Sequence, residues 1–304
     1  MKEDIKRMIN DFVVRALIYM FLGPIIMTTI RGAVSVLGLN DNIEFSIHPI
    51  WMILLFLLPA MKDLKVSPLE TNKKVGTGIS VVDTIALVLL SWSLYIFIVR
   101  SLNFIGEIEI IKTIIQSIEG SGTNSMSKYS PLLITVTSLI NIVTVDLIFR
   151  GVLLNALRKY GDVFAIIVSS TMYALILGHP IVIPFHLIIG ILTGTLYVLS
   201  NDIKAPIMFS LLLSFGGEYL REYMPNIFGN EMYFYGIVLI IASIYLGSRK
   251  DFRNYISLLK NQYRGERNTN KGKYAAAFKT EVFLALAILT ILRIIFTLAS
   301  AFMI

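Results

Sequence analysis

The chain has 304 residues, of which 56% are hydrophobic and 15% are charged, and its mean hydropathy is +0.74. A soluble domain cannot bury that much apolar surface, so the composition excludes a soluble globular protein and indicates a polytopic membrane protein with one integral membrane domain over residues 1–304. The net charge of +7 does not indicate nucleic acid as a partner, because basic residues collect in the cytoplasmic loops of membrane proteins.

Apolar runs along the chain predict an all-α fold, a polytopic transmembrane helical bundle. A spanning helix needs about 20 mostly apolar residues. The runs lie at residues 16–37, 45–61, 79–99, 131–149, 163–183, 185–200, 205–220, 233–247 and 282–303. Several of them are short, so the sequence leaves the number of spans open between eight and nine.

Lysine and arginine concentrate before the first run and after the second, fourth, sixth and eighth. Basic loops face the cytoplasm, so we expect a multi-pass protein of the cell membrane with a cytoplasmic N-terminus. With nine spans, the C-terminus lies outside. The basic cytoplasmic loop at residues 249–280 is expected to touch anionic lipid of the bilayer, and a dedicated partner site is the alternative.

The fourth run contains an aspartate and an arginine, in the stretch DLIFRG. Asp146 and Arg150 stand four residues apart, so on a helix they share a face and can pair. Charged residues inside spans are candidate functional residues. Helix geometry alone favours a structural ion pair over catalysis.

Two other pairs concern packing and buried charge. Gly190 and Gly194 form a small-xxx-small pair, which lets a neighbouring helix approach closely. Asp83 and Arg293 are further charges at or within spans. The sequence allows them to pair with each other or to line a water-filled cavity.

Three segments in order, DLIFRGVLLNALRKYG, SSTMYALIL and GILTGTLYVLSNDIKAPIMFSLLLS, resemble the CPBP (CAAX protease and bacteriocin-processing, or Abi) family of intramembrane metalloproteases. The resemblance covers about residues 145–214, within core spans at 131–220. It implies three motifs, Glu-Glu-x-x-x-Arg, Phe-x-x-x-His and His-x-x-x-Asn. In the family the glutamates and histidines of these motifs bind a divalent metal and activate water, so that its members hydrolyse peptide bonds near the membrane surface.

The first motif is only partly retained. Its paired glutamates fall on Val145 and Asp146, and its arginine is retained as Arg150, followed by Gly151 as in the common form. The leading glutamate is therefore absent, and the second is replaced by a shorter carboxylate.

The second and third motifs lack their histidines. The aromatic residue of the second is Tyr173, which places its histidine on Leu177, and the third falls on Ser210 and Ser214. A hydrolytic zinc ion needs about three protein ligands and a base near its bound water. The resemblance therefore predicts a CPBP/Abi-like fold that has lost its catalytic residues and binds no cofactor.

A rebuilt metal site is the competing hypothesis. His179, His186, Glu218 and Glu222 supply two imidazoles and two carboxylates, a plausible metal-binding set. With substituted ligands the chain would be an active intramembrane metalloprotease of the CAAX or bacteriocin-processing type. Against this, the expected topology puts His179 and both glutamates near the external face, whereas the family's site opens near the cytoplasmic face.

The function implied is that of a pseudoenzyme. Degenerate members resemble the surface-protein-display type of Gram-positive bacteria, which implies a scaffold or regulator in cell-wall metabolism or surface-protein display. The expected partner is a membrane-anchored protein, with a peptidoglycan hydrolase or a sensor histidine kinase as candidates. A bacteriocin self-immunity protein is a third hypothesis, and it predicts that deleting the gene causes sensitivity to the peptide.

Overall fold

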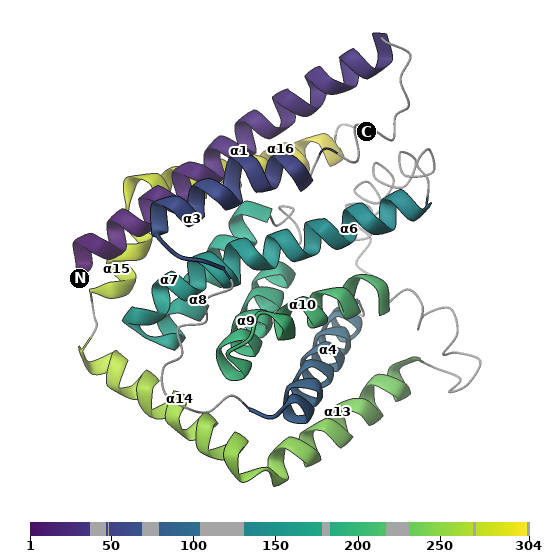
Figure 1. The fold of residues 1–304 in the computed structure, drawn as a ribbon, viewed down its shortest axis with the longest axis vertical. Helices are drawn as coiled ribbons and strands as arrows, with labels where there is room; N and C mark the ends of the chain where they lie inside the picture. Colours follow the sequence, from purple (N-terminus) through teal and green to yellow (C-terminus); the bar gives the residue numbers. More distant parts are fainter. Residues whose placement is uncertain are drawn as a thin grey trace.

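The computed structural model describes residues 1–36, 47, 49–68, 79–103, 131–177, 183–216, 231–269 and 272–302, and within these ranges every regular element is a helix (Figure 1). In chain order the helices are α1 (Lys2–Val36), η1 (Ile53–Leu57), α3 (Leu58–Leu64), α4 (Val81–Asn103), α6 (Pro131–Asp146), η3 (Leu147–Leu154), α7 (Asn155–Leu157), η4 (Arg158–Tyr160), α8 (Asp162–Leu177), α9 (Ile183–Ser200), α10 (Lys204–Leu211), η6 (Leu212–Gly216), α13 (Glu231–Ser248), α14 (Lys250–Thr269), α15 (Lys273–Phe278) and α16 (Glu281–Phe302). The all-α prediction is confirmed over the described residues.

Four of the described helices are long and apolar enough to cross a membrane. They are Lys2–Ile30, Val81–Ile98, Thr135–Tyr160 and Ile183–Ser200. Shorter apolar helices lie at Asp162–Leu177, Lys204–Phe215 and Tyr233–Ser248. The chain is therefore a helical membrane protein, as its composition predicts.

Apolar side chains on the outside of the bundle agree with this assignment. Ile240, Ile241 and Ile244 of α13 are each more than half exposed, and Phe296 of α16 is 73% exposed. A soluble monomer rarely presents contiguous apolar patches of large size. These faces fit the hydrocarbon of a bilayer.

The larger hydrophobic core joins the N-terminal helices to η3. The rings of Phe12, Phe56 and Phe149 meet with centroid distances of 5.1 to 6.0 Å, one ring each from α1, η1 and η3. Tilted and edge-to-face arrangements of this kind are favoured between aromatic rings. An ion pair between Arg15 Nε and Asp63 Oδ2, at 2.6 Å, also ties α1 to α3.

A second, smaller core lies between α4, α9, α10 and α13. Trp92 of α4 and Tyr235 of α13 pack edge to face at 5.3 Å between ring centroids. Phe209 brings α10 into the same cluster. The two cores thus place α8, α9 and α10 side by side in the middle of the bundle (Figure 1).

Glycine allows α8 and α9 to approach closely. A Cβ atom built on Gly190 would lie 2.9 Å from the Cα atom of Ser170, a contact that real Cβ atoms do not make. One turn further on, a Cβ atom on Gly194 would meet Leu154 and Ile166 at 3.3 and 3.4 Å. The Gly190 side of α9 is therefore the side that packs on α8.

Polar contacts tie the helix ends together at the end of the bundle where α1 begins. Arg158 Nε lies 2.9 Å from Asp162 Oδ1, and Arg158 Nη1 donates to Asn201 Oδ1 at 2.7 Å. Lys273 Nζ donates to the carbonyl oxygen of Tyr160 at 2.5 Å. These contacts join η4, the start of α8, the residue after α9 and the start of α15. We call this the N-terminal end of the bundle.

Candidate functional site

The retained part of the first motif lies where a regular α-helix changes into a π-helix. Helix α6 ends at Asp146, and residues Leu147–Leu154 form the π-helical segment η3, with i→i+5 hydrogen bonds. Gly151 in this segment packs directly on Pro68, because a Cβ atom there would lie 2.7 Å from Pro68 Cβ. Such π-helical turns occur frequently at functional sites. Here the turn holds Arg150 inside the bundle.

Asp146 and Arg150 form an ion pair. Arg150 Nε lies 3.5 Å from Asp146 Oδ1, and the two side chains are only 2% and 3% exposed. Arg150 also donates from Nε to the hydroxyl oxygen of Thr193 at 2.9 Å, and its Nη2 contacts the same oxygen. The Thr193 hydroxyl in turn donates to the carbonyl oxygen of Ile189 at 2.7 Å. The guanidinium thus links η3 to α9.

Aromatic rings complete the surroundings of the guanidinium. Its Cζ atom lies 4.3 Å from the ring centroid of Tyr173 on α8, a cation–π distance, and 6.0 Å from that of Phe149. The imidazole of His186 on α9 packs against Tyr173 at 5.8 Å between ring centroids. His186 therefore lies within the bundle next to the second-motif aromatic residue.

The three motifs meet only in part. Ser210 on α10 interacts with the Asp146 carboxylate, so the first and third motif positions are adjacent. Ser214 is exposed in η6. Val145 and Leu177 are half-buried and pack against the larger core. The residues brought together are thus Asp146, Arg150, Tyr173, Thr193 and Ser210, which we call the motif cluster.

Two atoms of the motif cluster keep hydrogen-bonding capacity. Asp146 Oδ2 and Arg150 Nη1 are buried and have no hydrogen-bond partner within the described part of the chain. Buried polar atoms of this kind usually bind ordered water. The cluster therefore has one acceptor and one donor available for water.

The residues at the family's metal-binding positions do not fit a hydrolytic zinc ion. They supply one carboxylate, which is engaged by Arg150, and one neighbouring hydroxyl, with leucine at the second-motif histidine position. Such an ion needs about three protein ligands. Across the described ranges, no three His, Cys, Asp or Glu side chains gather into a metal-binding group.

The rebuilt metal site falls mostly outside the described residues. His179, Glu218 and Glu222 belong to ranges that the structure does not describe. Only His186 of that set is described, and it packs on Tyr173.

For two residues of the motif cluster, the sequence alone does not predict the contacts that they make in the structure. Thr193, the hydrogen-bond partner of Arg150, is 43 residues away in sequence and lies in an apolar run. The sequence predicts Tyr173 only as the aromatic residue of the second motif, whereas in the structure its ring face packs against the guanidinium of Arg150. Thr193 lies between Gly190 and Gly194 on α9, a polar residue inside a packing stretch, and that position was the available signal.

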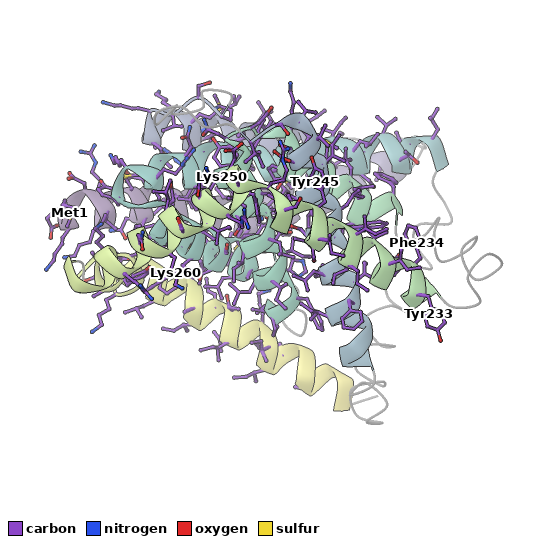
Figure 2. The ribbon with its side chains drawn as sticks, turned by 90° about the horizontal axis from the view of Figure 1, so that it is seen from below. Met1, Tyr233, Phe234, Tyr245, Lys250 and Lys260 are labelled. Carbon is purple, nitrogen blue, oxygen red and sulfur yellow. The ribbon has the colours of Figure 1, made fainter. Side chains whose placement is uncertain are left out.

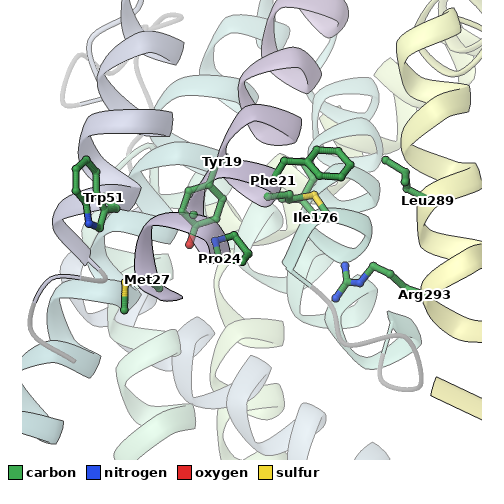
Figure 3. Close-up of a pocket in the computed structure, with 10 residues that line it drawn as sticks. Tyr19, Phe21, Pro24, Met27, Trp51, Ile176, Leu289 and Arg293 are labelled. Atoms are coloured by element: carbon green, nitrogen blue, oxygen red, sulfur yellow. The ribbon is translucent and has the colours of Figure 1, made fainter. Parts of the chain in front are cut away.

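A cavity of about 460 Å³ lies apart from the motif cluster, among α1, α8 and α16 (Figure 3). Its walls are apolar, with Tyr19, Phe21 and Leu289 among them, and Arg293 lies at one edge. Asp83, by contrast, is paired with Arg249 at 3.1 Å. Asp83 does not line this cavity, so the two charges that the sequence offered as a pair or as a common cavity lining lie in different surroundings.

Comparison with known families identifies the region that contains the motif cluster. Residues 127–216 match the family described as Type II CAAX prenyl endopeptidase Rce1-like. No curated protein and no solved structure matches the chain. The match covers less than a third of the chain, and it includes every residue of the motif cluster. The predicted resemblance to the CPBP family is therefore confirmed over this segment.

Proposed function

We propose that this chain, whose residues 127–216 belong to the CPBP family, is a catalytically inactive member that acts as a scaffold or regulator of another membrane or envelope protein. The observation that carries the proposal is the pairing of Asp146 with Arg150. Asp146 is the one carboxylate left at the family's motif positions, and it is engaged by a buried cation.

The chemistry of peptide hydrolysis supports this conclusion. A metalloprotease needs a metal-bound water and a base that takes its proton. In the motif cluster the carboxylate faces a guanidinium and a serine hydroxyl. The histidines of the second and third motifs are replaced by Leu177 and Ser210. Nothing in this set supplies both a metal ligand shell and a base.

The proposed partner is a membrane-anchored protein of cell-wall metabolism or surface-protein display, with a peptidoglycan hydrolase or a sensor histidine kinase as candidates. This step rests on the likeness to degenerate CPBP members, which is an argument from fold analogy. The exposed apolar face of α13, with Ile240, Ile241 and Ile244, gives a spanning partner a surface inside the bilayer.

The proposed topology has eight or nine spans in the cell membrane and a cytoplasmic N-terminus. Each of the nine apolar runs overlaps at least one described helix, although four of those helices satisfy length and hydropathy for a full crossing. Basic residues in alternate loops support the orientation.

A second candidate, an active intramembrane metalloprotease, is favoured by the family description itself, which is that of a prenyl endopeptidase. Its ligands would come from His186 together with His179, Glu218 and Glu222. The one described residue of this set, His186, is half-buried and packs on Tyr173 of the motif cluster.

One experiment separates the two candidates. The full-length chain is crosslinked in native membranes, purified, and analysed both for bound protein and for zinc or cobalt. The regulator predicts a reproducible membrane-protein partner that remains with His186→Ala, and no metal above the level of a mock purification. Stoichiometric metal that is lost in His186→Ala, with a chelator-sensitive peptidase activity and no partner, would establish the protease instead.

A further inference from the structure

Helix α14 is fixed across the N-terminal end of the bundle (Figures 1 and 2). At its start, Arg249 Nε lies 3.1 Å from Asp83 Oδ1, and the Tyr245 hydroxyl donates to the same oxygen at 3.0 Å. Phe252, in its first turn, packs against the smaller core, and α14 also contacts α8. The helix is thus held against α4, α8 and α13.

A stripe of exposed basic residues runs along α14. Lys250, Arg253, Lys260 and Arg264 are all exposed. At about 100° per residue they fall within an arc of roughly 80° on the helix. The acidic Asp251 lies outside this arc, roughly 100° beyond Lys250, which stands at one edge of the arc. We call the four basic residues Lys250, Arg253, Lys260 and Arg264 the basic stripe.

An apolar residue lies directly beside the basic stripe. Ile256 is 42% exposed and stands about 40° beyond the edge of the arc, toward the side on which Phe252 packs. Leu258 is 62% exposed and lies about 200° from Ile256, on the opposite side of the helix. The helix therefore has a packed side, an apolar flank and a cationic stripe, in that order around its axis.

We propose that the basic stripe binds the headgroups of anionic phospholipids, with Ile256 inserted at the boundary of the acyl chains. Interfacial helices have this arrangement, an apolar flank in the acyl boundary with lysine and arginine reaching the phosphate groups. Four clustered cations complement an anionic membrane surface. The stripe lies at the ends of the spans, where headgroups are found, so lipid is favoured over an acidic protein. The proposal does not depend on the catalytic state of the motif cluster.

The test uses the absence of cysteine from the chain. A single-cysteine variant, Ile256→Cys, is labelled with a polarity-sensitive fluorophore and reconstituted at full length in nanodiscs. We expect a blue-shifted emission and protection from an aqueous quencher when phosphatidylglycerol is added to phosphatidylcholine. Salt at about 1 M should reverse the change, because the Debye length falls to about 3 Å. The same emission in both lipids would overturn the proposal.

Matched variants identify the stripe as the cause. The triple variant Arg253→Gln, Lys260→Gln and Arg264→Gln should abolish the lipid-dependent shift, because three cations at an anionic surface contribute about a hundredfold to binding. Removing three exposed lysines elsewhere, with Lys62→Gln, Lys65→Gln and Lys204→Gln, should leave it intact. A fluorophore at Leu258→Cys should stay accessible to the quencher. Equal loss in both triple variants, or equal protection at Leu258, would contradict a specific role for the stripe.

Discussion

Arg150 joins three elements through one buried guanidinium, which contacts Asp146 at the end of α6, Thr193 on α9 and Tyr173 on α8. Replacing Arg150 by alanine would leave a buried carboxylate without its cation. We expect Arg150→Ala to lower the free energy of unfolding by about 3–5 kcal/mol, the usual cost of breaking a buried pair from one side. Thermal unfolding of the purified chain in detergent measures it.

The double variant Asp146→Leu with Arg150→Met is the control for this prediction. It removes both charges, so no unpaired charge remains buried, and its stability should lie much closer to that of the parent. If Arg150→Ala unfolds at the parent temperature yet fails to retain the crosslinked partner, the pair belongs to a binding site and its structural role is refuted.

Thr193 is the second residue on which the motif cluster depends. Its hydroxyl accepts from Arg150 and donates to Ile189, so Thr193→Val leaves buried arginine donors unsatisfied. The expected cost is about 1–3 kcal/mol. Thr290 is the matched control, since its buried hydroxyl donates only to Leu286 of its own helix among the contacts described, at 2.8 Å. Equal melting temperatures for Thr193→Val and Thr290→Val would argue against the link to Arg150.

At the scale of helices, the spacing of residues along the sequence predicts an ion pair within one helix. It predicts neither the π-helical turn nor a contact between two helices. The Asp146–Arg150 contact was predictable because both residues lie within one turn of the same helix. The π-helical turn of η3 was not, because the pattern of apolar and polar residues over an eight-residue segment does not distinguish i→i+4 from i→i+5 hydrogen bonding. The Thr193 contact joins residues 43 apart, so only tertiary packing decides it.

The segment at 249–280 is a second case in which the sequence predicts the composition but not the structure. Its composition predicted a basic loop, and the described residues form the helices α14 and α15 there. The basic stripe depends on that helix, since the four cations share a face only at helical spacing. The sequence therefore predicts the number of basic residues in this segment, but their common face on α14 becomes apparent only in the structure.

The close approach of α8 and α9 depends on the absence of a side chain at Gly190. Gly190→Ala places a methyl group 2.9 Å from Ser170 Cα, which belongs to the backbone of the neighbouring helix and cannot rotate away. The two helices must separate, and we expect a loss of about 1–3 kcal/mol in unfolding free energy. Gly236→Ala on α13 is the control, because nothing lies within 4 Å of its Cβ position. It should be neutral or stabilising by up to about 1 kcal/mol. A Gly190→Ala variant that melts with Gly236→Ala would contradict the close approach.

At the scale of the whole molecule, the directions of the first and last helices bear on how many times the chain crosses the membrane and on which side each end lies. Helix α1 begins beside α15, and α16 follows α15 directly, so α1 and α16 contact each other and run the same way (Figure 1). In the proposed topology α1 is the first span and α16 is the last. A first and a last span that run the same way require an odd number of crossings. Of the two proposed span numbers we therefore expect nine, which predicts that Lys2 and Phe302 lie on opposite sides of the membrane.

Single cysteines test this, because the parent chain has none to interfere. In intact cells a membrane-impermeant maleimide should label Phe302→Cys and leave Glu3→Cys unlabelled, and both should react after lysis. The expected difference follows from a cytoplasmic N-terminus with nine crossings. Labelling of both sites in intact cells, or of neither, would place the two ends on one side. An even number of spans would then be required, and the parallel course of α1 and α16 through the bilayer would be wrong.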